Sequence, residues 1–142
     1  MASIVFDSFL ADIASGAINP STDTFYAMLT TDSYIPNIAT HTKRSNVTNE
    51  VVGTGYTAGG FPVTLTVVKN TTLHRLEITL GGATLPGTTL TCRNVVYYKR
   101  RGGASSADEL VAVNDAGMNV TTSNQPLQVT QSLMNISTPV AA

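Results

Sequence analysis

The 142-residue sequence has no tryptophan, a single cysteine and few charged residues, which make up 12% of the chain. One cysteine excludes an intrachain disulfide, and we expect Cys92 to be a small buried apolar residue. The charged share is about half of the usual one. A formal net charge of −1 argues against a nucleic-acid-binding protein, which would present a basic face. Low charge favours a surface that is partly buried in an assembly.

Long apolar runs are also missing. No apolar stretch approaches the roughly 18 residues needed to span a bilayer, so we expect no membrane partner. Asp7 and Asp12 lie where a signal peptide would carry positive charge and an apolar run, so we expect no such peptide. A chain of this length fits one domain, predicted to span residues 1–142, and needs neither a disulfide nor a metal to fold.

Motifs that carry catalysis are absent from the sequence. It contains no P-loop, no G-x-S-x-G elbow, no H-E-x-x-H and no C-x-x-C motif. The nine carboxylates are scattered, and their spacing does not indicate a paired general acid and base. His41 and His74 have no Cys, Asp or Glu at metal-ligand spacing. We therefore predict no catalytic residue, no metal and no cofactor, in a protein that is not an enzyme.

The sequence does contain a succession of short alternating runs that glycine and proline separate. In the longest, residues 88–99, the alternation places Leu90, Cys92, Asn94, Val96 and Tyr98 on one face. About eight strands at this spacing predict an all-β antiparallel sandwich or barrel rather than a parallel α/β fold. The predicted strands are 24–31, 61–69, 73–80, 88–99, 110–114, 119–122 and 125–137.

One amphipathic helix is predicted at the N-terminus, over residues 3–15. Val5, Phe9, Leu10 and Ile13 fall on one helical face, and Gly16 lies where a helix would stop. In a β protein such a helix either covers an open end of the sandwich or packs against a neighbouring molecule. The second alternative makes Phe9 a candidate contact residue.

The least generic stretch is residues 41–60, which we predict to be an ordered, glycine-rich loop. Four glycines fall between positions 53 and 60, which indicates backbone turns that a Cβ would forbid. We expect at most one helical turn after Arg44, and a carboxylate–His or Arg44–Glu50 contact that holds the loop. A long irregular segment between strands is often functional, which makes Arg44, Asn49, Glu50 and Tyr56 candidate contact residues.

A second candidate segment begins with three consecutive cations, Lys99, Arg100 and Arg101. Small residues and then Asp108 and Glu109 follow them. One interpretation is a solvated hairpin tip whose charges partly cancel. The other is a flexible basic loop over residues 100–108 that docks on an acidic partner. Three cations are too few for DNA, because affinity for DNA scales with the number of phosphates neutralised.

The first 60 positions contain an ordered series of short motifs. They are Thr22-Asp23-Thr24-Phe25, Met28-Leu29, Ser33-Tyr34-Ile35-Pro36, His41, the run from Arg44 to Val51, and the run from Gly53 to Gly60. This order of residues resembles a family of small tailed-bacteriophage structural proteins, the capsid cement (decoration) proteins. After position 60 the similarity is one of strand pattern only. The resemblance implies a jelly-roll-like β-sandwich.

The resemblance further implies a protein of the virion, made in the host cytoplasm, that binds the outer surface of the assembled shell and bridges its capsomers. Its partners would be the major capsid protein of the same phage and a second copy of itself, as a homodimer or alternatively a trimer. The alternatives are a tail or neck connector, and a receptor- or glycan-binding module with exposed tyrosines. The candidate contacts are Phe9, Arg44, Asn49, Glu50, Tyr56, Lys99, Arg100 and Arg101, together with the tail 138–142.

Overall fold

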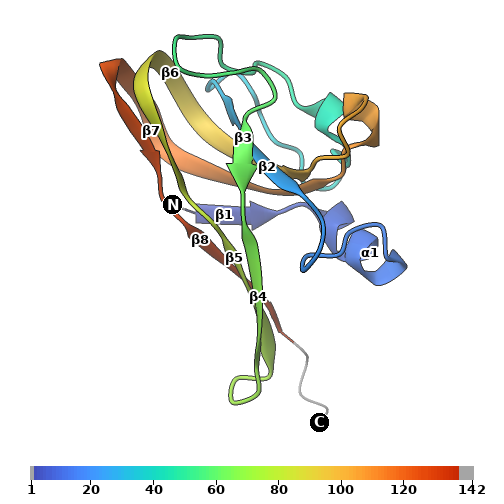
Figure 1. Ribbon diagram of the computed structural model, residues 1–142. Helices are drawn as coiled ribbons and strands as arrows, with labels where there is room; N and C mark the ends of the chain where they lie inside the picture. The colour runs from blue at the N-terminus through green and yellow to red at the C-terminus, as the bar shows by residue number, and fades with distance from the viewer. Residues whose placement is uncertain (1, 138–142) are drawn as a thin grey trace.

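The computed structural model describes residues 2–137 and is built almost wholly of β-strands (Figure 1). One α-helix, α1 (Asp7–Ser15), and two short 3-10 turns, η1 (Arg44–Asn46) and η2 (Ser105–Ala107), accompany eight strands. The predicted all-β class is therefore confirmed. The strands are β1 (Ala2–Val5), β2 (Phe25–Thr30), β3 (Phe61–Val63), β4 (Leu65–Asn70), β5 (Arg75–Leu80), β6 (Ala83–Lys99), β7 (Leu110–Val129) and β8 (Ser132–Ser137).

The strands form two antiparallel sheets. The larger has five strands in the order β1-β7-β6-β2-β3, and the smaller has three in the order β4-β5-β8. The chain crosses from one sheet to the other after β3, β5 and β7. Long strands β6 and β7 curve together along one side of the molecule, and the hairpin of β4 and β5 extends away from it (Figure 1).

The main hydrophobic core lies between the two sheets. Leu29, Tyr97 and Val111 of the five-stranded sheet pack in one cluster with Ile78 and Leu80 of the smaller sheet, and all five side chains are fully buried. Burying a side chain of this kind contributes about 1.5–3 kcal/mol. Cys92 belongs to this cluster, as predicted.

A second core covers the opposite face of the five-stranded sheet, named here the outer face. Met28, Val96 and Tyr98 project from the sheet on this side and pack with Tyr34, which lies in the connection between β2 and β3. That connection is polar in composition. It nevertheless covers the sheet, because the side chain of its Tyr34 is buried against the sheet. Strand β2, predicted over residues 24–31, is therefore covered on both faces.

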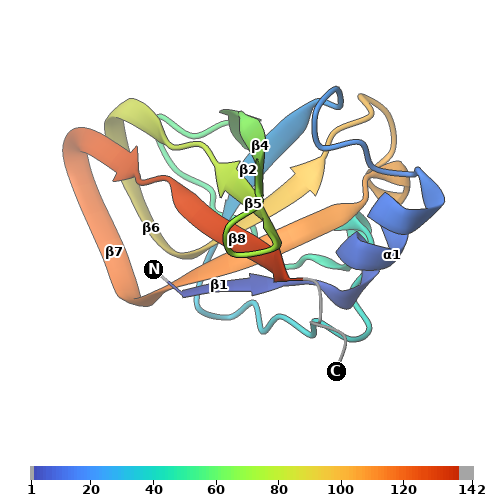
Figure 2. The same ribbon diagram turned by 90° about the horizontal axis from the view of Figure 1, so that it is seen from below.

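The predicted helix 3–15 is wrong over its first third. Residues Ala2–Val5 form β1, which pairs with β7, and the helix begins only at Asp7 after an extended Phe6. Pairing with β7 outweighs the helical periodicity here, since Ile4 and Val5 are β-branched and suit a strand. Helix α1 lies at one end of the sandwich (Figure 2) and ends at Gly16, as predicted.

The five-residue face predicted for strand 88–99 is also wrong beyond Cys92. The register of β6 against β7 shifts between Cys92 and Asn94, so the alternation changes parity there. Val95 and Tyr97 therefore join Cys92 in the inter-sheet core, while the residues between them face outward. The register leaves Arg93 of β6 and residues 116–119 of β7 without a partner, and this irregularity produces the change.

Similar irregularities explain the remaining differences in strand boundaries. The predicted turn at residues 115–117 is a register shift inside the continuous strand β7. The predicted strand 125–137 is two strands, because the chain leaves the five-stranded sheet at Val129 and enters the smaller one at Ser132. The alternation in the sequence changes parity at Leu133-Met134, which suggests a bulge; in the structure the buried positions change from Val129 to Met134 because the chain changes sheet.

Candidate functional site at the loop end of the outer face

The segment 41–60 is fixed along its length by contacts with the strands. One 3-10 turn forms at Arg44–Asn46, in agreement with the single turn expected there. Further along, Val51 N donates to Leu29 O at 2.9 Å, and Thr54 pairs with Thr89 of β6 in an isolated bridge. These backbone contacts hold the segment against the five-stranded sheet.

Glu50 and Tyr56 form the internal support of this segment. One carboxylate oxygen of Glu50 accepts from Tyr56 Oη at 2.7 Å and from Gly59 N at 2.6 Å. Tyr56 Oη also accepts from Leu29 N of β2 at 3.0 Å. Burial raises the pKa of Tyr56, and the hydrogen bond to the Glu50 carboxylate raises it further. Both candidate contact residues are therefore engaged within the chain.

The expected Arg44–Glu50 contact is wrong, because Arg44 has a different partner. Arg44 Nε donates to Asp108 Oδ2 at 2.8 Å, across 64 positions of sequence. The Asp108 side chain is only 1% exposed, and its other oxygen accepts from Arg101 N at 2.9 Å. His41 contacts no carboxylate through its Nδ1 but lies 2.9 Å from Tyr34 Oη.

Two glycines close the segment at positions where other residues would be strained. Gly59 and Gly60 have φ angles of +92° and +89°, in the region that favours glycine. A Cβ on Gly60 would lie 1.8 Å from the carbonyl oxygen of Ala27, whereas the space beside Gly59 is open to 3.8 Å. The carbonyl of Gly59 accepts a hydrogen bond from Tyr98 Oη. The close approach of Gly60 to β2 and the hydrogen bond between Gly59 and Tyr98 of β6 anchor the loop directly on these two strands.

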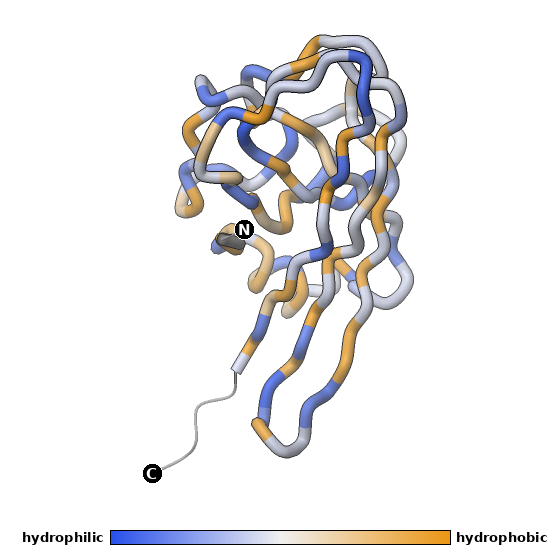
Figure 3. Tube along the Cα trace, turned by 90° about the vertical axis from the view of Figure 1, so that its left-hand side faces the viewer, coloured by the Kyte–Doolittle hydropathy of each residue, from blue (hydrophilic) through white to orange (hydrophobic). Residues whose placement is uncertain are grey.

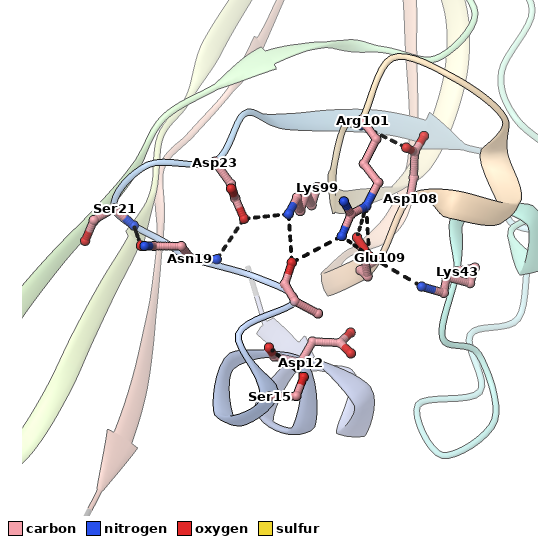
Figure 4. A network of polar contacts seen from close by, with 11 residues as sticks. Asp12, Ser15, Asn19, Ser21, Asp23, Lys43, Lys99, Arg101, Asp108 and Glu109 are labelled. Atoms are coloured by element: carbon pink, nitrogen blue, oxygen red, sulfur yellow. Dashed lines mark hydrogen bonds and ion pairs between the residues drawn. The ribbon is translucent and has the colours of Figure 1, made fainter.

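Strand alternation divides the three consecutive cations between two sides of the molecule. Lys99 and Arg101 face the helix side, where Lys99 Nζ lies 2.9 Å from Asp23 Oδ2 and Arg101 Nη2 lies 2.6 Å from Glu109 Oε1 (Figure 4). Both also donate to the carbonyl of Ala17. Lys99 and Arg101 are therefore tied to neighbouring segments of their own chain.

The pKa of Glu109 reflects this network. Burial of the carboxyl alone would raise its pKa, but the hydrogen bonds from Arg101, a backbone hydrogen bond and the charges of Lys43 and Arg101 together outweigh that effect, and the pKa is lowered. Lys43 Nζ adds a further cation 3.5 Å from Glu109 (Figure 4). The segment 100–108, expected to be flexible, is thus tied by Arg101 at one end and by Asp108 at the other.

Arg100 faces the outer side and has a different environment. Its Cζ lies 4.3 Å from the ring centroid of Tyr26, while Cζ of Arg44 lies 5.0 Å from that of Tyr98. The two rings are 6.3 Å apart. Stacking on an aromatic face holds a guanidinium in place and leaves its N–H edge open for a ligand.

Arg44 and Arg100 border a small pocket of about 200 Å³, named here the outer pocket. The charge of Arg44 is neutralised by Asp108 of the same chain. The Arg100 guanidinium, in contrast, has no carboxylate or carbonyl acceptor among residues 2–137. A guanidinium with free N–H groups binds carboxylates in a bidentate manner. The lining residues are Arg44, Glu50, Ala58, Gly59, Arg100, Gly102, Gly103 and Asp108.

The remaining candidates lie elsewhere. Phe9 is fully buried in the inter-sheet core, so the prediction that it contacts a partner is wrong; its neighbours are the chain's own strands. Asn49 is exposed, has a φ of 58° and uses its carbonyl to accept from Thr31 N, but it does not line the outer pocket. The tail 138–142, also proposed as a contact, lies outside the described residues.

Three residues of this site were missed by sequence reasoning. In the sequence, Asp108 is only part of a compensating charge pair, and Tyr26 and Tyr98 are strand residues that the glycan-binding alternative would need exposed. The structure brings them together because Tyr26 pairs with Tyr98 in the β2–β6 register. Their parity within each strand was visible in the sequence, but the pairing of the two strands was not.

Within the described part of the chain, no group of three or more His, Cys, Asp or Glu side chains is placed to hold a metal ion. No helix there is long and apolar enough to cross a membrane. The five tyrosines are buried or half-buried, so none offers the exposed ring that a glycan-binding patch requires. Comparisons with models of protein families, with curated proteins and with solved structures find no match for this chain.

Proposed function

We propose that this protein is a virion structural protein, a capsid cement protein that binds the outer surface of an assembled phage shell as an oligomer. The observation that carries the proposal is the outer pocket with Arg100. The stretch that resembles the cement family supplies Arg44, Glu50 and Gly59 to this pocket, and the same stretch is held rigidly on the sheet. A preorganised surface of this kind loses little conformational entropy on docking.

In this proposal the partner is the major capsid protein, and its contribution to the outer pocket is an acidic side chain. Arg100 lacks an acceptor of its own within residues 2–137, so an incoming carboxylate has no internal competitor for its N–H groups. The stacked guanidinium would hold that carboxylate through two parallel hydrogen bonds. Because the chain carries little net charge, one such contact adds specificity rather than strong long-range attraction.

The stabilising mechanism is linkage. A protein that binds the assembled shell but not its separated subunits lowers the free energy of the assembled state, and the effect grows with every site filled. An oligomer that contacts two capsomers at once gains further through effective concentration. Neither nucleic acid nor a membrane takes part. The jelly-roll form of the sandwich stays a prediction of the resemblance.

The test is binding of purified variants to expanded shells that lack this protein. Arg100→Ser is expected to weaken binding and to reduce its sensitivity to salt, without a change in melting temperature. Arg93→Ser is the matched control, since Arg93 is a surface cation on β6 that pairs with the exposed Asp115 and does not line the outer pocket. Equal binding by Arg100→Ser and the unmodified protein would contradict the role given to the pocket.

A variant of the adjacent residue, Arg101→Ser, gives a second comparison with Arg100→Ser. Because Arg101 pairs with the buried carboxylate of Glu109, this variant is expected to lower the melting temperature, with binding reduced only through loss of structure. The two variants therefore distinguish an effect on docking, at Arg100, from an effect on folding, at Arg101.

A further inference from the structure

Strand β4 has one unpaired edge. It hydrogen-bonds to β5 on one side and, within residues 2–137, to no strand on the other. Gly81 N donates to Thr64 O at 2.7 Å, which fixes the phase of the β4–β5 ladder. Since hydrogen-bonded and non-bonded pairs alternate, the N–H and C=O groups of Leu65, Val67 and Lys69 point away from β5.

The other sheet edges are obstructed in ways that β4 is not. Strand β3 has only three residues, and its central Pro62 has no N–H to donate. The connection between β2 and β3 passes beside β1: Asp7 N, two residues after the strand, donates to Ile38 O, and Ile4 borders one pocket together with Pro36 and Ile38. Strand β8 lies beside β1 at the lower edge of the sandwich (Figure 2).

The β4–β5 hairpin also stands clear of the rest of the molecule. Its strands extend beyond the body of the sandwich in two perpendicular views (Figures 1 and 3). Val68 is 51% exposed on the strand and Leu73 is 56% exposed at the tip. An uncovered edge strand with β-branched apolar residues and a single charge favours pairing with another strand.

We propose that β4 pairs antiparallel with β4 of a second copy of this chain, around a two-fold axis through Val67, to give a continuous six-stranded sheet. In this register Val67 lies opposite Val67 of the second copy. Leu65 then lies opposite Lys69, and Thr66 opposite Val68. Every residue with free backbone groups on this edge, at positions 65, 67 and 69, would meet a partner with free groups.

The charges are compatible with this self-pairing. Lys69 is the only charged residue of β4, and the two-fold places it opposite Leu65 rather than opposite its own copy. No like charges therefore face each other across the strands, a juxtaposition that would destabilise the sheet. The inference concerns the isolated chain and does not depend on the proposed role in a capsid.

Two exposed positions on the outward-facing side of β4 supply a matched pair of variants. Because Thr66 faces Val68 of the second copy, Thr66→Lys with Val68→Lys opposes two cations at each of two places. Thr66→Lys with Val68→Glu instead opposes a cation and an anion. The unmodified chain, of mass 14.9 kDa, is expected to sediment with twice that mass. The Lys/Lys variant is expected at half the dimer mass and the Lys/Glu variant at the full dimer mass.

A monomeric unmodified chain at about 100 µM, or equal masses for the two variants, would overturn the proposal. Hydrogen exchange on the unmodified protein gives a second measurement that needs no variant. The amides of Leu65, Val67 and Lys69 are expected to be protected at high concentration and to exchange faster on dilution. Rapid, concentration-independent exchange at these three amides would overturn the proposal, whatever the variants do.

Discussion

Replacing Gly60 by alanine tests how tightly the 41–60 segment is seated on the sheet. With φ at +89°, any residue other than glycine carries a backbone penalty of about 1–2 kcal/mol. The new Cβ would also lie 1.8 Å from Ala27 O, and ordinary contact begins near 3.4 Å. Relief requires the loop to move off β2 beside Phe61, which pairs with Ala27.

The matched control is Gly59→Ala. Gly59 has a nearly identical φ of +92°, but its nearest neighbours, Arg100 and Tyr98, lie 3.8 Å from the position of a Cβ. Gly59→Ala therefore carries the backbone penalty alone, and Gly60→Ala adds overpacking of about 1–3 kcal/mol. The difference between the two variants isolates the contact with β2.

The assay is thermal unfolding of both variants under the same conditions. At roughly 3–5 °C for each kcal/mol in a chain of this size, Gly59→Ala is expected to lower the melting temperature by roughly 3–10 °C. Gly60→Ala is expected to lower it by at least roughly twice as much. Equal decreases in the two variants would refute the argument, because they would show that the Ala27 carbonyl does not limit the position of the loop.

Two further predictions concern groups that hold the loops. Tyr56→Phe removes the hydroxyl shared by Glu50 and Leu29 N and is expected to cost about 1–3 kcal/mol in chemical denaturation, and an unchanged midpoint would contradict the shared bond. The lowered pKa values of Asp23 and Glu109 predict stability that is full above the unfolded values of 3.8 and 4.5 and is lost as pH falls through the folded ones. Glu109→Gln should reduce the loss between pH 5 and 3, and an unaltered pH profile would count against the Arg101–Glu109 network.

Local features of this fold could be predicted from the sequence. Alternation located β2, the usual burial of a free cysteine placed Cys92 in the core, and the glycine run indicated positive φ angles near Gly59. Each of these follows from neighbouring residues alone, because side-chain period and glycine freedom are local properties. The single turn after Arg44 is likewise a local feature that could be predicted from neighbouring residues.

Features that depend on distant residues could not be predicted. The irregularity after Cys92 exchanges the faces of Val95 and Val96, and the glycine that accompanies it, Gly117 with a φ of +80°, lies on the opposite strand β7. The Arg44–Asp108 pair joins positions 64 residues apart, and no pattern in one sequence specifies it. The end of this strand at Lys99 was predicted, but the separate surroundings of Arg100 and Arg101 depend on which strands pair with β6, since β2 supplies Tyr26 and the chain entering β7 supplies Glu109.

The central claim is that this chain binds many equivalent positions on an assembled capsid. The most direct measurement is co-sedimentation of the purified protein with expanded shells that lack it, quantified as copies bound per shell at saturation. Saturation at hundreds of copies is expected, in a fixed ratio to the shell protein that gives the symmetry of the sites. No binding, or saturation at about a dozen copies, would contradict the cement role and favour a tail or neck connector.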